Sequence, residues 1–130
     1  MQRVLLAEDN KLNQIVAAGT LRKLGYEIEI VDGGTAAVEI CRHERFDAVL
    51  MDVMMPDMDG YEATARIRAD ELAGGRLHTP IIGLSARAMD GDRQIALDAG
   101  FNDYLTKPLR EDALKDALER WIGAPIILRT

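Results

Sequence analysis

The 130-residue chain contains one cysteine, Cys41, few aromatic residues and no long apolar run. A single cysteine excludes a disulfide within the chain and is typical of a reducing compartment. No run approaches the roughly 20 apolar residues of a membrane-spanning helix. The short apolar run that follows Arg3 is not a secretory signal peptide. These absences predict a cytoplasmic protein without direct membrane contact.

Basic residues are also scarce relative to acidic ones. The 16 lysines and arginines face 22 aspartates and glutamates, which gives a formal charge of −6. Nucleic acids bind proteins through a basic face, so this charge argues against a nucleic-acid partner. The composition, 48% hydrophobic and 29% charged, is that of a globular domain and not of a disordered chain.

Short apolar runs alternate with amphipathic stretches along the chain. The predicted strands are residues 3–7, 26–31, 46–51, 80–84 and 103–105. The predicted helices are residues 11–24, 35–45, 59–72, 90–99 and 110–122. Five strand–helix units in a row predict a parallel sheet, because parallel strands need crossover connections, and five are too few for an eight-fold barrel. We therefore predict one open, doubly wound α/β domain over residues 1–122 and a tail over residues 123–130.

Two elements carry further local signals. Residues 26–31 alternate apolar and acidic side chains in part, which indicates a strand at the edge of the sheet. Asn10 is a candidate N-cap for the first helix. The apolar or small residues that share one stripe of that helix are Leu12, Ile15, Val16 and Gly19.

Ligands of open doubly wound sheets bind beyond the carboxyl ends of the strands, where the strand order reverses. The polar residues that directly follow predicted strands are Glu8, Asp9, Asp52, Ser85 and, after residue 105, Lys107. If the first and third strands are neighbours, three carboxylates, a hydroxyl and an ammonium group converge at one edge. Each residue alone would be an ordinary turn or capping residue, so the prediction depends on their joint placement.

The charges of this set indicate a metal site. Glu8, Asp9 and Asp52 together carry −3, which is unfavourable at close range without a cation. A divalent ion and Lys107 would bring the sum to zero. Oxygen ligands without histidine or cysteine favour Mg²⁺, with Mn²⁺ as the alternative, over zinc. A metal, a lysine and a carboxylate nucleophile are suited to phosphoryl transfer.

Four segments, in order, resemble the response-regulator receiver domain: VLLAEDN from Val4, LMDVMMPDMDG from Leu50, LSA from Leu84 and YLTKP from Tyr104. The likeness covers about residues 3–122. It implies a flavodoxin-like (βα)5 fold with strand order 2-1-3-4-5 and a place in a two-component, His–Asp phosphorelay system. The opening Glu8-Asp9-Asn10 with Asn13, and the connection at 69–79, are similar to receivers of hybrid histidine kinases.

The resemblance implies a role for each matching residue. Asp52 is the phosphoacceptor, which takes a phosphoryl group from a phosphohistidine. Asp9, Asp52 and the backbone carbonyl of Met54 ligate Mg²⁺, and Glu8 acts through a water. Lys107 pairs with the phosphoryl group. The resemblance also implies a cis peptide bond between Lys107 and Pro108.

The resemblance further implies that Ser85 and Tyr104 form a switch, in which the hydroxyl turns toward the phosphoryl oxygens and the ring moves inward. The surface of the fourth helix, fifth strand and fifth helix would change with it. The implied partners are a histidine kinase dimerisation domain or a histidine phosphotransfer protein, with a weak homodimer through the same surface. Such a domain is not a conventional enzyme, because it catalyses only its own phosphorylation and dephosphorylation.

Other interpretations remain open at this point. The chain could be a stand-alone response regulator rather than part of a hybrid kinase. A Mg²⁺-dependent small-molecule phosphatase would need a second carboxylate where Met54 stands. A flavin carrier would need a phosphate loop where Glu8 and Asp9 would repel phosphate. Met54 and Arg87 are expected to flank the route of an attacking water, and the tail either folds back or forms a small contact surface beside Trp121.

Overall fold

The computed structural model describes residues 2–86 and 91–123, and these form alternating strands and helices. The strands are β1 (Arg3–Ala7), β2 (Glu27–Val31), β3 (Ala48–Asp52), β4 (Ile81–Ser85) and β5 (Asp103–Thr106). The helices are α1 (Lys11–Lys23), α2 (Gly34–His43), α3 (Gly60–Ala73), α4 (Asp92–Asp98) and α5 (Glu111–Ile122). The predicted tail beyond residue 123 and the predicted start of the fourth helix at 90 lie outside the described residues.

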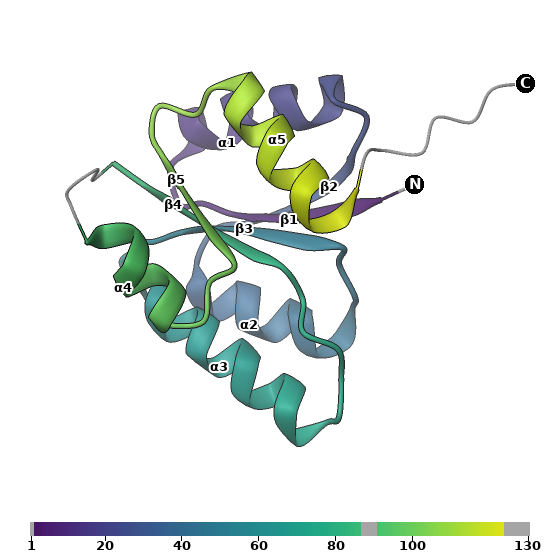
Figure 1. Cartoon of the computed structure of the whole chain (residues 1–130), viewed down its shortest axis with the longest axis vertical. Coiled ribbons are helices and arrows are strands. Elements are labelled where there is room, and N and C mark those ends of the chain that lie inside the picture. Colours follow the sequence, from purple (N-terminus) through teal and green to yellow (C-terminus); the bar gives the residue numbers. More distant parts are fainter. Residues whose placement is uncertain (1, 87–90, 124–130) are drawn as a thin grey trace, which may run out of the picture.

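All five strands are parallel and lie in the order β2-β1-β3-β4-β5. Figure 1 shows the sheet between two helical layers, with α1 and α5 on one face and α2, α3 and α4 on the other. Each layer closes a hydrophobic core of its own against the sheet. The predicted doubly wound α/β fold, strand order included, is confirmed.

The strands differ in burial according to their place in the sheet. Every residue of β3 and β4 is buried, as expected for central strands that are covered on both faces. In β2 no residue is fully buried, and its acidic residues face solvent. Its position at the edge of the sheet confirms the prediction from its alternating sequence. β3 starts and ends later than predicted, so that Asp52 is its last residue and not the first residue after it.

Helix α1 does not pack on the sheet through its apolar stripe. Leu12, Ile15 and Val16 are 68%, 69% and 55% exposed. The residues that α1 buries are Gln14, Ala17, Ala18 and Leu21. The buried face of α1 thus combines two alanines with Leu21 and Gln14, and the predicted stripe lies on the surface. Asn10 does cap this helix, since its side chain accepts a hydrogen bond from Asn13 N at 3.0 Å.

A partly buried arginine, Arg68, joins helix α3 to the edge of the sheet at which β4 and β5 begin. The guanidinium of Arg68 on α3 donates to Thr79 O at 2.7 Å, Gly100 O at 3.0 Å and the side chains of Glu71 and Asn102. Asn102 in turn accepts a hydrogen bond from Ile81 N at 2.8 Å. These bonds link α3 to the segments that precede β4 and β5, at the edge opposite the carboxyl ends of the strands.

The two ends of the described chain lie side by side (Figure 1). The side-chain amide of Gln2 donates to the carbonyl of Ile122 at 2.6 Å, which joins the start of β1 to the end of α5.

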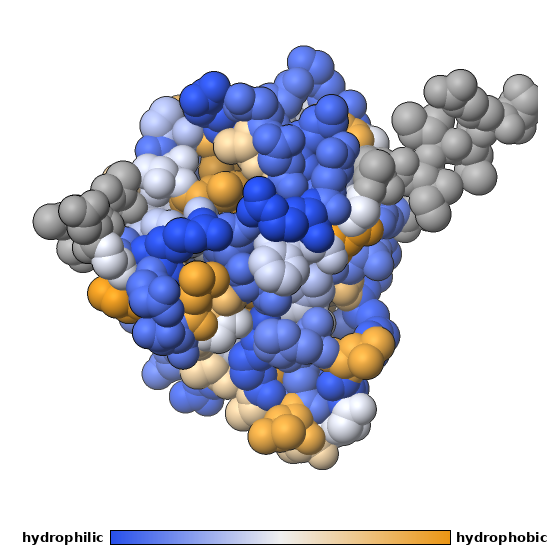
Figure 2. Space-filling view, in the orientation of Figure 1, coloured by the Kyte–Doolittle hydropathy of each residue, from blue (hydrophilic) through white to orange (hydrophobic). Residues whose placement is uncertain are grey.

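Figure 2 shows a mostly hydrophilic face with separate hydrophobic patches, including some over the C-terminal end of α3. In that region Leu72 and Leu77 are 86% and 76% exposed. Among the described residues, no helix has the length and apolar character needed to cross a membrane.

Candidate functional site

Three carboxylates meet at the carboxyl ends of β1 and β3. These strands are neighbours, with Ala7 opposite Met51. Glu8 therefore follows β1 beside Asp52, the last residue of β3. Glu8 and Asp52 are buried, whereas Asp9 is exposed, and one oxygen from each of the three lies within 4.8 Å of the others. The structure thus brings together the acidic cluster predicted from the strand ends.

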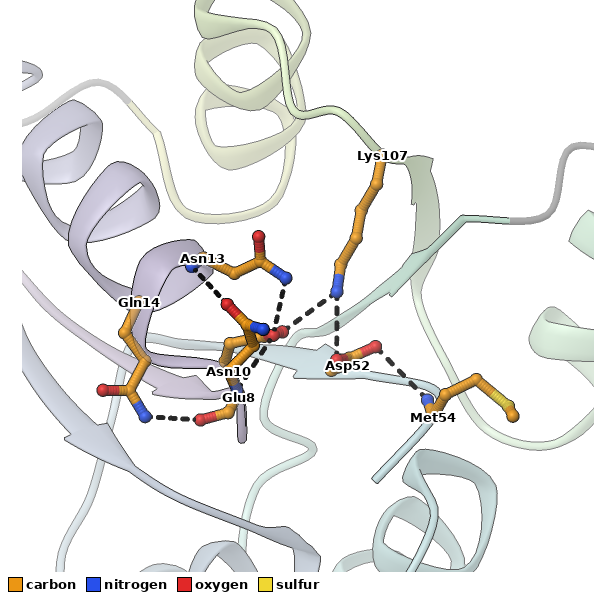
Figure 3. A network of polar contacts seen from close by, with 7 residues as sticks. All are labelled: Glu8, Asn10, Asn13, Gln14, Asp52, Met54 and Lys107. Carbon is orange, nitrogen blue, oxygen red and sulfur yellow. Dashed lines mark hydrogen bonds and ion pairs between the residues drawn. The ribbon is translucent and has the colours of Figure 1, made fainter. Parts of the chain in front are cut away.

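Lys107 bridges the two buried carboxylates (Figure 3). Its Nζ lies 3.0 Å from Glu8 Oε2 and 3.0 Å from Asp52 Oδ2. The residue directly follows β5, and its backbone N donates to Ser85 O at 2.7 Å, which fixes the start of its side chain beside β4. The peptide bond between Lys107 and Pro108 is cis.

The charges in this cluster do not balance. The three carboxylates carry −3 and Lys107 carries +1, so the sum is −2. Burial, reinforced by the neighbouring Glu8, raises the pKa of Asp52 to about 6 against the opposing effect of Lys107. Burial lowers the pKa of Lys107, but its bonds to Asp52 and Glu8 outweigh burial and leave that pKa raised. A set of hard oxygen donors with this excess charge fits a divalent cation such as Mg²⁺.

The first turn of α1 holds Glu8 in place. Asn13 Nδ2 donates to Glu8 Oε1 at 3.0 Å, and Gln14 Nε2 donates to the Glu8 carbonyl at 2.6 Å (Figure 3). Gln14 Nε2 also lies 2.7 Å from Asp32 Oδ1, beyond the end of β2. We did not predict these two amides as site residues. For Asn13, the sequence offered only its place in the segment that resembles hybrid-kinase receivers. Nothing in the sequence pointed to Gln14.

The loop after β3 surrounds Asp52 with backbone groups. Met54 N donates to Asp52 Oδ1 at 3.2 Å, while the Met54 side chain points away from the site (Figure 3) and is 69% exposed. The loop then returns, because Gly60 N donates to Val53 O at 2.9 Å. A Cβ on Gly60 would lie 2.4 Å from Asp52 O, so this turn requires glycine.

Asp57 and Asp59 of the same loop are capping residues. Asp57 accepts hydrogen bonds from Gly34 N at 3.3 Å and Thr35 N at 3.1 Å, so it caps α2 from a distant part of the sequence. Asp59 accepts from Glu62 N at 2.8 Å and caps α3.

Ser85 and Tyr104 lie on neighbouring strands, as their predicted pairing requires. Ser85 is the last residue of β4 and is buried, next to Leu84, the residue opposite Asp52. Tyr104 lies within β5 and is 8% exposed. Arg87, which was expected to flank the route of water, lies outside the described residues.

Asp103, the first residue of β5, is a buried carboxylate that joins three elements. It lies 2.8 Å from Arg93 of α4 and 3.0 Å from Arg120 of α5, and it accepts a hydrogen bond from Trp121 Nε1 at 3.0 Å. Burial raises the pKa of Asp103, but the bonds from Trp121, Tyr104 N and Arg93 outweigh burial and lower it. The surface of α4, β5 and α5 is thus tied together beside Tyr104.

A groove of about 210 Å³ adjoins the acidic cluster. Its walls come from α1 and from the segment after β5, and Glu8 and Lys107 lie at its end. The remaining lining residues are Leu6, Leu12, Asn13, Val16, Ala17, Leu84, Pro108 and Leu109. Leu12 and Val16 of the exposed stripe of α1 therefore line a mostly apolar groove that includes Glu8 and Lys107 of the site.

Comparisons with known proteins agree with this geometry. The sensor protein GacS of Pseudomonas syringae pv. syringae is 43% identical over 121 residues, which is 93% of this chain and 13% of that protein. The histidine-protein kinase BarA of Escherichia coli K12 is 39% identical over 121 residues, 91% of this chain and 12% of that protein. The chain thus spans about an eighth of the length of these relatives.

Solved structures include two informative matches. The receiver domain of the sensor histidine kinase PA1611 from Pseudomonas aeruginosa PAO1, with magnesium coordinated in its active-site cleft, is 47% identical, with a TM-score of 0.84 over 95% of this chain and 98% of that one. The receiver domain of Ssk1 in complex with the histidine phosphotransfer protein Ypd1 from Saccharomyces cerevisiae is 32% identical, with a TM-score of 0.88 over 93% and 88%.

A sequence profile of the response regulator receiver domain matches residues 4–119. This range contains four strands in full, all of β1 except Arg3, the acidic cluster and Lys107. The strand order, the convergence of polar groups at one edge and the relatives all agree with the profile. The chain therefore belongs to the response regulator receiver domain family.

Proposed function

We propose that the chain is the phosphoacceptor domain of a His–Asp phosphorelay and that Asp52 takes a phosphoryl group from a phosphohistidine. The observation that carries this proposal is the buried Asp52 carboxylate, which lies 3.0 Å from Lys107 and beside two further carboxylates. A buried nucleophile with an adjacent fixed cation and an acidic metal site is suited to phosphoryl transfer.

In the proposed reaction, a carboxylate oxygen of Asp52 forms a bond to phosphorus. The phosphorus–nitrogen bond to the donor histidine breaks, and the imidazole keeps its electron pair. Met54 N and Lys107 Nζ bind different oxygens of Asp52, so together they orient the carboxylate. Lys107 also offsets negative charge that gathers on the phosphoryl oxygens.

Mg²⁺, when bound, would supply further positive charge at the phosphoryl oxygens. Asp9, Asp52 and the Met54 carbonyl would be its ligands, and Glu8 would act through a water. Mn²⁺ has the same preference for oxygen and would be a substitute. The magnesium in the PA1611 receiver supports this assignment.

The proposal includes a switch at Ser85 and Tyr104. An acyl phosphate on Asp52 adds charge and acceptor oxygens at the edge where Ser85 ends β4. If the Ser85 hydroxyl turns toward those oxygens, Tyr104 on the neighbouring strand can change its position. The surface of α4, β5 and α5 would then present a different contact to partners, including a second copy of the chain.

The groove along α1 is the proposed docking site for the phosphodonor. Leu12, Ile15 and Val16 are exposed along a helix that leads toward Glu8 and Lys107. A partner helix with an apolar face that carries the phosphohistidine would cover this stripe and place its imidazole near Asp52. A histidine phosphotransfer protein or a kinase dimerisation domain provides such a helix, and the Ypd1–Ssk1 complex supports this class of partner.

The relatives support a further proposal, that the domain is part of a hybrid histidine kinase that signals in the cytoplasm. GacS and BarA are much longer than this chain, which matches only a segment of each. The alternative is a stand-alone response regulator. In either arrangement the domain would catalyse only its own phosphorylation and dephosphorylation.

Incubation with acetyl phosphate and Mg²⁺ tests the phosphoacceptor directly. Intact-protein mass spectrometry should show the addition of one phosphoryl group, and Asp52→Asn should abolish it. Asp116→Asn, an exposed residue of α5, is the matched control and should be phosphorylated like the wild type. Equal phosphorylation of the Asp52→Asn variant would refute the assignment.

The docking site requires a separate test. Val16→Lys should slow transfer from a phosphorylated histidine phosphotransfer protein at least tenfold, because a lysine would be buried in an apolar contact. Leu72→Lys is the matched control on the far end of α3, where the side chain is 86% exposed. Both variants should react normally with acetyl phosphate. If Leu72→Lys slows transfer as much as Val16→Lys does, the groove is not the docking site.

A further inference from the structure

One side-chain amide outside the proposed ligand set contacts the acidic cluster directly. Asn13 Nδ2 lies 3.0 Å from Glu8 Oε1, whereas Lys107 holds the other oxygen, Oε2, at 3.0 Å. Each oxygen of the buried Glu8 carboxylate therefore has a different side-chain donor, and the two donors come from opposite sides of the site (Figure 3).

The backbone of Glu8 is fixed independently of its side chain. Its carbonyl accepts a hydrogen bond from Gln14 at 2.6 Å, and its N–H donates to Val31 O at 3.1 Å. The remaining freedom of Glu8 lies in its side-chain torsions. Among the described residues, Asn13 and Lys107 are the side chains that donate to the Glu8 carboxylate, and the backbone N–H of Asn10 adds a longer bond to Oε1 at 3.4 Å.

These two donors differ in one essential respect. The Lys107 ammonium is also bonded to Asp52 and is the group proposed to pair with the phosphoryl oxygens. A phosphoryl group on Asp52 would compete with Glu8 for the N–H donors of Lys107. The Asn13 amide has no such second task, and because it is neutral it leaves the negative charge of the cluster undiminished for a cation.

We propose that Asn13 is a positioning residue for the divalent cation, and that it acts by holding the Glu8 carboxylate in the orientation the cation requires. This inference rests on the proposed function, because it takes the acidic cluster as the Mg²⁺ site. Removal of a group that orients a direct ligand of a metal weakens binding by about 10- to 100-fold. In the proposed site Glu8 reaches the cation through a water, so we expect an effect at the lower end of this range for Asn13.

The local structure makes Asn13→Ala a clean test. The N-cap of α1 uses the backbone N of Asn13, not its side chain. Alanine is also a better helix former than asparagine. The variant should therefore keep its thermal stability without Mg²⁺, so that any loss of Mg²⁺ affinity reports the contact with Glu8.

The experiment is a Mg²⁺ titration of the phosphodonor-free protein, followed by backbone amide chemical shifts. We expect Asn13→Ala to weaken Mg²⁺ binding about tenfold. Thr20→Ala, on the same helix, should leave it unchanged, because that hydroxyl bonds only to Val16 O at 3.1 Å among the described residues. An affinity of Asn13→Ala within twofold of the wild type would overturn the inference.

A double-mutant cycle with Glu8→Gln identifies the route of the effect. If Asn13 acts through Glu8, Asn13→Ala should cause no further loss of Mg²⁺ affinity in the Glu8→Gln background. An undiminished second loss would overturn this route. Failure of wild-type protein to bind Mg²⁺ would instead refute the proposed metal site.

Asn13 also lines the docking groove, so a role in partner contact has to be separated. A positioning residue should slow phosphorylation by both acetyl phosphate and a phosphotransfer protein at limiting Mg²⁺, and high Mg²⁺ should restore both rates. A defect with the phosphotransfer protein alone, with unchanged Mg²⁺ affinity, would show that Asn13 is a docking residue and overturn the inference.

Discussion

Lys107 and Asp52 form an ion pair of 3.0 Å across the edge of the sheet, from the segment after β5 to the end of β3. Lys107→Ala removes this cation. Phosphorylation by acetyl phosphate should slow at least tenfold, a loss of about 1.4 kcal/mol or more in transition-state stabilisation. Mg²⁺ should bind a few-fold more tightly, because a competing positive charge is gone. Lys115→Ala, an exposed lysine of α5, is the control. Weaker Mg²⁺ binding in Lys107→Ala would contradict this view of the pair.

Burial of the Asp52 carboxylate, reinforced by the neighbouring Glu8, should lower the stability of the fold at neutral pH. The pKa of Asp52 is raised from 3.8 to about 6, so the folded state holds this proton longer than the unfolded state does. Stability from this residue therefore falls as pH rises from about 4 to about 6. Above pH 6, Asp52→Asn should be more stable than the wild type by about 1–2 kcal/mol in urea unfolding. The difference should fade toward pH 4, and a constant difference would disprove this cause.

Asp103 should stabilise the fold at neutral pH, in contrast to Asp52. Its pKa is lowered in the folded protein by bonds from Trp121, Tyr104 N and Arg93 that outweigh burial. Its stabilisation is therefore complete above its unfolded pKa near 3.8 and is lost as pH falls through the lower folded value. Asp103→Asn should destabilise the domain by about 2 kcal/mol at pH 7. Asp116→Asn is the matched control, and equal stability of both variants would contradict the role of this carboxylate.

Substitution by alanine should have opposite effects on stability at two glycines, Gly60 and Gly19. In Gly60→Ala, the new Cβ would lie 2.4 Å from Asp52 O, so the loop behind the acceptor must shift. The variant should lose about 2 kcal/mol and be phosphorylated more slowly. Gly19 has no neighbouring atom within 4 Å of such a Cβ, so Gly19→Ala should gain about 1 kcal/mol through helix propensity. Thermal unfolding and acetyl phosphate kinetics measure both. A stable, active Gly60→Ala would show that the loop is pliable.

The fold and the acidic cluster were predictable because strand ends are local signals. A continuous apolar run followed by Asp52 marks both a buried strand and the residue at its carboxyl end, and parallel packing then brings such ends together. The prediction of residues 46–51 differs from β3 at both ends. Phe46 is apolar but precedes the strand, and its ring packs under the Arg3 guanidinium, 4.7 Å from Cζ to the ring centroid.

The contacts that were missed depend on partners from other elements. Gln14 is buried because Glu8 O and Asp32 accept from its amide, and nothing within α1 indicates this. The exposed stripe of α1 was misleading for a related reason. Hydropathy ranks Leu12 above Ala17, but the way α1 faces the sheet buries Ala17 and Leu21 and leaves Leu12 exposed.

The bond between Gln2 and Ile122 determines how this domain can be joined to other polypeptide. Both connection points lie at the end where β1 begins, and the acceptor lies where β1 and β3 end. Both points thus lie at the end of the sheet opposite Asp52. The same short separation makes circular permutation feasible, with residues 122 and 2 joined and new termini in a distant surface loop. The domain can thus be inserted into another chain, appended to one or circularly permuted with all connections at the end of the sheet away from Asp52.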